Sequence, residues 1–160
     1  MDQTAGIEFL RHNLATLAYR GAKTLRDAPE GFATYRAAET TRTPGEILAH
    51  IGDLFDWAIT IADGQMKWHD SAPLPWPEEI ERFFRTLKTF DDRLASGVPL
   101  AMTVEKLFQG PVADAFTHFG QIALLRRMAG APVRGESYFM ARIEIGRVGP
   151  DQEAPRREFD

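Results

Sequence analysis

Apolar residues recur every three or four positions along four long stretches of this 160-residue sequence. The first stretch shows the pattern most plainly, at Ile7, Leu10, Leu14, Leu17 and Leu25. This spacing places apolar side chains on one face of an α-helix, whereas a half-buried strand requires alternation of apolar and polar residues. The pattern therefore predicts an all-α protein in which each helix buries one face.

Prolines, glycines and capping residues mark the ends of the predicted helices. The strongest signal is Thr43-Pro44-Gly45-Glu46. The threonine can cap the helix, and the glutamate can reach back to the cap. Proline suits the first position of the helix, because a backbone N–H there would have no partner within the helix. We predict helices over 3–25, from 44 to about 66, over 77–96 and over 110–129. They are joined by a loop over 27–41, a rigid connection over 70–77 and a capped turn over 103–108.

The predicted helices have similar lengths, which favours an antiparallel four-helix bundle with extra short helical segments. About 19 residues at 1.5 Å each give the last helix a length of roughly 28 Å. We expect one domain over 1–149 and a loosely held polar tail over 150–160. Residues 137–145 fit either an alternating strand or a short helix, and we favour the helix. The expected core comprises Ile47, Leu54, Phe83, Leu87, Phe116, Phe119 and Ile122.

Charge and hydropathy exclude two classes of partner. With 19 Lys and Arg against 23 Asp and Glu the net charge is −4, and the basic residues do not cluster, so no nucleic-acid partner is expected. No apolar run approaches the roughly 18 residues of a membrane span, so no membrane partner is expected. The first residues lack the layout of a secretion signal, which makes a cytoplasmic location the expectation.

The absence of cysteine removes several chemistries. It excludes a disulfide scaffold, a thiolate metal site and a thiol nucleophile carried by the protein. None of the serines lies in a nucleophile elbow, and neither a phosphate-binding glycine loop nor a His-Glu-x-x-His motif is present. Any metal ion must therefore be held by histidines and carboxylates.

Asp114 and His118 are spaced to share one face of the last helix, where they could bind a common ion or form an exposed ion pair. His50 falls inside the apolar stripe of the second helix, so its imidazole needs a partner. That partner could be a core oxygen, with Glu46 and Asp53 as nearby candidates, or a metal ion. His12 and His69 lack a comparable setting and are expected at the surface.

Two segments carry a family resemblance. Residues 43–51 (TPGEILAHI) and 114–127 (DAFTHFGQIALLRR) resemble the DinB/YfiT-like superfamily of metal-dependent helical bundles, and the resemblance extends over most of the chain. It implies that His50 and His118 occupy metal-ligand positions. Asp114 stands where the family usually has the first histidine of a His-x-x-x-His pair, of which His118 is the second. A carboxylate can bind the same ions. The resemblance thus implies a divalent metal, Zn, Ni or Fe, held by two histidines and one aspartate.

The same resemblance implies a function. Similar proteins include thiol-dependent S-transferases and isomerases that use a low-molecular-weight thiol, so we expect a metal-dependent transferase or hydrolase that acts on a small molecule. Trp57 and Gln121 are expected to line the substrate pocket, whereas no catalytic residue is assigned. The alternative is a non-catalytic, stress-related helical bundle that acts in binding or assembly. Aromatic residues such as Trp57, Trp68 and Trp76 on the helices and their connections favour a homodimer.

Overall fold

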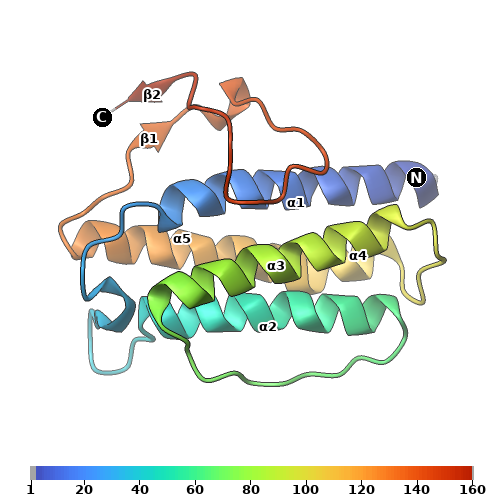
Figure 1. Cartoon of the computed structure of the whole chain (residues 1–160), viewed down its shortest axis with the longest axis horizontal. Coiled ribbons are helices and arrows are strands. Elements are labelled where there is room, and N and C mark those ends of the chain that lie inside the picture. The colour runs from blue at the N-terminus through green and yellow to red at the C-terminus, as the bar shows by residue number, and fades with distance from the viewer. Residues whose placement is uncertain (1–2, 160) are drawn as a thin grey trace.

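The computed structural model describes residues 3–159 and is mostly helical, which confirms the all-α prediction. Its long helices lie side by side (Figure 1) and are α1 (Gln3–Leu25), α2 (Pro44–Ala62), α3 (Trp76–Ala95) and α5 (Ala113–Met128). Shorter helical segments are η1 (Phe32–Thr34), α4 (Val104–Leu107), η2 (Phe108–Val112) and η3 (Tyr138–Met140). Strands β1 (Gly135–Glu136) and β2 (Glu158–Phe159) pair antiparallel, with Gly135 opposite Phe159. None of the described helices is long and apolar enough to cross a membrane.

The start of α2 has the predicted capping box. The Thr43 hydroxyl accepts a hydrogen bond from the Glu46 amide at 3.2 Å, and the Glu46 carboxylate accepts one from the Thr43 amide at 2.7 Å. The end of α2 was predicted about four residues too late. The helix stops at Ala62 because Gly64 and Met66 adopt left-handed backbone conformations, with φ of 78° and 47°.

The predicted capped turn and last helix form one continuous helical run. Thr103 caps α4, as expected, with its hydroxyl 3.4 Å from the Lys106 amide. The chain does not start a new helix at Gly110, however, because η2 is a π-helical turn that contains Pro111 and leads directly into α5. Proline cannot donate an α-helical hydrogen bond, and the wider turn accommodates it without a break.

Hydrogen bonds between α2 and α3 establish the relative direction of these two helices. Near the start of both α2 and α3, Arg82 donates to the Ala49 carbonyl at 3.2 Å, and near their ends Arg93 donates to the Ala62 carbonyl at 3.3 Å. These two helices are therefore parallel, in contrast to the antiparallel order expected from the sequence. The extended connection after α2 runs back along that helix (Figure 1), which permits the parallel arrangement.

One hydrophobic cluster contains side chains from all the long helices. The predicted core residues are buried in it, except Phe116, which is only partly buried. Gly21 of α1 allows a close approach, since a Cβ atom there would lie 3.0 Å from the Phe119 ring of α5. This packing brings α5 against α1 and α2, and so fixes the face of α5 that carries the candidate ligands.

The C-terminal residues are more firmly held than the sequence indicates. Lys23 of α1 forms ion pairs of 2.7 Å with both Glu136 and Glu158, and the Tyr19 hydroxyl donates to Glu136 at 2.6 Å. Val148 is buried in the hydrophobic cluster. Within residues 137–145 the favoured short helix is present only as the three-residue 3-10 helix η3.

Replacing Thr43 by alanine removes one hydrogen bond from the first turn of α2. We expect the free energy of unfolding to fall by about 0.5–2 kcal/mol, measured by urea unfolding followed by circular dichroism. Thr89→Ala is the control, because Thr89 is exposed within α3 and bonds only to its own helix, and its effect should stay within about 0.5 kcal/mol. Equal losses in the two variants would contradict the capping role.

Candidate metal centre

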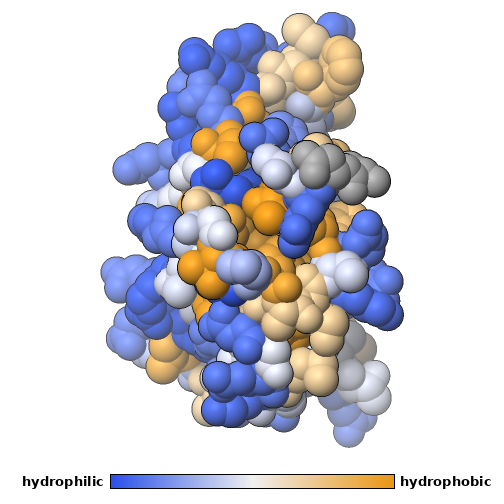
Figure 2. All heavy atoms as spheres, turned by 90° about the vertical axis from the view of Figure 1, so that its right-hand side faces the viewer, coloured by the Kyte–Doolittle hydropathy of each residue, from blue (hydrophilic) through white to orange (hydrophobic). Residues whose placement is uncertain are grey.

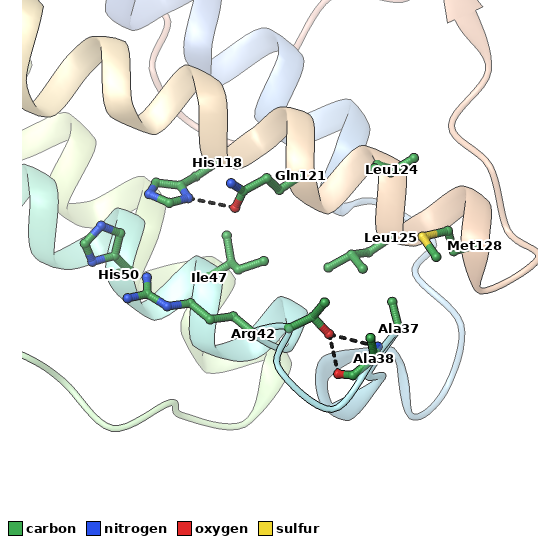
Figure 3. A pocket seen from close by; sticks show the side chains of 11 residues that line it. Ala37, Ala38, Arg42, Ile47, His50, His118, Gln121, Leu124, Leu125 and Met128 are labelled. Carbon is green, nitrogen blue, oxygen red and sulfur yellow. Dashed lines mark hydrogen bonds between the residues drawn. The ribbon is translucent and has the colours of Figure 1, made fainter.

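The three predicted ligands come together between α2 and α5. His50 lies on α2, whereas Asp114 and His118 lie one turn apart on α5. Figure 3 shows the imidazoles of His50 and His118 facing each other across the space between the two helices. All three side chains are partly buried, so they are shielded from bulk water but not sealed from it.

The distances fit a shared ion. His50 Nε2 lies 3.6 Å from Asp114 Oδ2, and His118 Nε2 lies 3.4 Å from Asp114 Oδ1. The two imidazole rings are 4.7 Å apart and nearly perpendicular. One ligand atom from each residue lies within 4.8 Å of the other two, so the group could hold a metal ion.

Neighbouring side chains orient both imidazoles. His118 Nδ1 donates to Gln121 Oε1 at 2.9 Å, which leaves the Nε2 lone pair directed toward Asp114. The Trp68 ring packs edge-on against His50, with ring centroids 5.4 Å apart. A histidine that binds a metal through one ring nitrogen usually has its other ring nitrogen hydrogen-bonded, as His118 does here.

Burial favours the neutral form of His50. Desolvation of its imidazole, together with repulsion from His118 and Arg42, lowers the pKa of His50 below its usual value, despite the opposing attraction of Asp114. Neutral imidazole is the form that binds a cation. Two such nitrogens and one carboxylate suit Zn, Ni or ferrous iron, and three protein ligands leave coordination positions open.

A cavity of about 700 Å³ adjoins His50 and His118. Gln121 lines it, as expected, whereas Trp57 lies in a separate hollow on the other side of Asp114 and packs against Trp68. The sequence analysis missed Arg42, Leu124 and Met128, which also line the cavity. Leu124 and Met128 are apolar, exposed and one turn apart on α5, and that spacing could have indicated an apolar wall.

A second group of possible ligands, Asp53, Asp56 and His69, is already occupied by a cation. The guanidinium of Arg82 contacts both carboxylates, and His69 lies 3.2 Å from each of them. His69 is half exposed, as predicted, but its two acidic contacts were not foreseen. A metal ion here would have to displace a buried arginine, so this group is better described as an ion-pair network.

The carboxylates suggested as partners of His50 have other roles. Asp53 accepts hydrogen bonds from Arg82 and from the Ser71 amide, and these lower its pKa although burial alone would raise it. Glu46 completes the cap of α2. The carboxylate near His50 is instead Asp114, which lies on a different helix.

Comparisons of the chain with models of protein families, with curated proteins and with solved structures found no match. The resemblance to the DinB/YfiT-like superfamily therefore stays a prediction from the residues themselves. The evidence for the site is the geometry of its side chains.

Metal content of protein purified without a histidine tag tests the site. We expect His50→Ala and His118→Ala to abolish uptake of Zn, Ni or Fe, because each removes a nitrogen ligand. Asp114→Ala should weaken uptake, and Asp114→His should preserve or strengthen it. His12→Ala, at an exposed position of α1, and His69→Ala are controls that should bind as the unmodified chain does. Equal metal content in every variant would remove the site from consideration.

Proposed function

We propose that this chain is a DinB-like, metal-dependent enzyme, and that its reaction is a thiol-dependent S-transfer. In this proposal His50, Asp114 and His118 hold a divalent cation, and the long helices form a four-helix bundle of the DinB type. The single observation that carries the proposal is the convergence of these three side chains, from two helices, beside a large cavity.

The cation would activate the nucleophile, since a divalent metal with an open position lowers the pKa of an adjacent thiol or water enough for attack near pH 7. The chain has no cysteine, so the sulfur must come from a cosubstrate. In the transfer, the thiol sulfur forms a bond to an electrophilic carbon of the acceptor. The leaving group departs with the bonding electron pair, and the thiol proton is released to solvent.

The protein's own residues would position the reactants. Gln121 fixes the orientation of His118, and Trp68 restricts the imidazole of His50. The apolar wall of the cavity, which includes Ile47 and Leu125, would exclude water from the acceptor and strengthen electrostatic interactions there. The hollow beside Trp57 lies next to Asp114 and is our candidate for the thiol.

Turnover with thiols tests the proposed reaction. We expect metal-loaded protein to join at least one of several low-molecular-weight thiols to an electrophilic acceptor, and a cobalt-substituted site to change its spectrum when that thiol is added. His118→Ala should do neither. Absence of turnover and of any spectral change with every thiol would overturn the S-transferase proposal and favour the hydrolytic or non-catalytic alternative.

We also propose that the chain forms a homodimer through the end of the molecule where α1 begins. Apolar side chains gather in the middle of this end, surrounded by hydrophilic ones (Figure 2). Phe9 of α1 is 57% exposed and lines a hollow of about 510 Å³ together with Val104 and Phe108. A second copy of the chain could cover this apolar surface.

Sedimentation velocity tests the dimer. We expect the unmodified chain to sediment as a dimer and Phe9→Glu to sediment as a monomer, because a charge would then lie inside the interface. Phe139→Glu makes the same change at a residue that is 95% exposed elsewhere, on η3, and should stay dimeric. A monomeric unmodified chain, or a dimer dissociated only by Phe139→Glu, would contradict the proposed surface.

A further inference from the structure

The cavity beside the candidate metal centre has two chemically different ends (Figure 3). We define the apolar end as the part formed by Ile47, Leu124, Leu125 and Met128. The polar end is formed by Arg42, His50, His118 and Gln121. A ligand that fills the cavity must therefore present a polar group at one end and an apolar body at the other.

Arg42 is the charged residue of the polar end. The cavity lining contains no carboxylate, and among residues 3–159 none forms an ion pair or hydrogen bond with the Arg42 side chain. The acidic residue nearest in sequence, Glu46, contacts Arg36 and the Thr43 amide, and it interacts with Arg42 only through the longer-range attraction that helps to lower the pKa of Glu46. In Figure 3 the guanidinium of Arg42 points toward His50, so its positive charge lies at the polar end of the cavity. Arg42 is exposed, and it also borders a separate hollow lined by Glu46, Asp53 and Asp70.

Gln121 adds a second hydrogen-bond donor. Its Oε1 accepts from His118, while its Nε2 bonds to no acceptor in the part of the chain that the structure describes. Both unengaged groups at the polar end, the guanidinium and the amide nitrogen, are therefore donors. They match the oxygens of an anion.

We infer that the cavity binds a small organic anion with an apolar body. Its charged oxygens pair with Arg42, and its apolar body lies against the wall formed by Ile47, Leu125 and Met128. Guanidinium binds oxyanions with paired, charge-assisted hydrogen bonds, and a volume of about 700 Å³ is within the usual range for small-molecule sites. The inference deepens the proposed function and rests on it for the cavity's catalytic role, because it names the class of acceptor.

Binding to the metal-free protein tests the inference without any contribution from the candidate metal centre. The full chain, treated with a chelator, is titrated with decanoate, decanol and decyltrimethylammonium, which share one apolar body and differ in charge. Calorimetry gives the affinities, and the shift of the Met128 methyl signal in NMR spectra reports whether the cavity is the site. We expect decanoate to bind at least about tenfold more tightly than the other two compounds.

Variants at two arginines assign the charge that is responsible. Arg42→Gln should lose at least about tenfold in decanoate affinity and leave decanol binding unchanged, and Arg42→Lys should keep part of the affinity. Arg127→Gln is the matched control, since Arg127 is exposed beside Met128 but does not line the cavity, and it should bind decanoate normally. Equal affinity for the three compounds, or an unaffected Arg42→Gln, would overturn the inference.

The result of the anion-binding test does not depend on whether the proposed thiol transfer occurs. Arg42→Gln should take up metal as the unmodified chain does, because Arg42 is not a ligand. Arg42-dependent decanoate binding without thiol transfer would support the anion site and count against the transferase. Thiol transfer without a preference for decanoate would support the transferase and overturn the anion site.

Discussion

The buried guanidinium of Arg82 holds α2 and α3 together in their parallel arrangement. It reaches from α3 to Asp53 and Asp56 on α2, and it also contacts Glu79 of its own helix at 3.2 Å. A buried cation is costly unless it is fully partnered, so these carboxylates and the arginine depend on one another. Gly52 provides the necessary space, since a Cβ atom there would lie 3.0 Å from the centre of the guanidinium.

The same network extends to the candidate metal centre. Asp53 accepts a hydrogen bond from the Ser71 amide at 2.8 Å and so anchors the extended connection to α2. The connection also carries Trp68, whose ring packs against His50. The surroundings of His50 therefore depend on an ion-pair network that includes none of His50, Asp114 and His118.

The features that could be predicted from the sequence are those set by the spacing of residues within one helix. The cap at Thr43, the buried faces of the helices and the shared face of Asp114 and His118 all follow from helical periodicity and the chemistry of helix ends. The direction of α3 does not, because a proline-rich connection indicates stiffness without indicating where the chain goes. The pairing of Lys23 with Glu136 joins residues more than 100 positions apart, which no local pattern encodes.

The cavity could not be predicted from the sequence, because its lining comes from segments that are far apart in the chain. Arg42 belongs to an irregular segment with no periodicity, so its side chain can be placed only after the loop is seen against α2 and α5. The sequence suggested that Trp57 would line the substrate pocket together with Gln121. Trp57 lies two turns beyond His50 along α2, in the smaller hollow that Asp114 also lines.

The π-helical turn η2 sets the rotation of the helix that supplies two of the candidate ligands. It includes about one more residue per turn than an α-helix, so it shifts the sequence spacing between residues of α4 and α5 that share a face. Deleting a single residue there would convert the π-helical turn to an α-helical one and leave both flanking helices facing as they do. Val104 would stay beside Gly6 of α1, and Asp114 and His118 would stay on the face of α5 that meets His50. A related chain shorter by one residue at this turn would therefore keep the three candidate ligands together, whereas the same deletion within a regular α-helical turn would separate them.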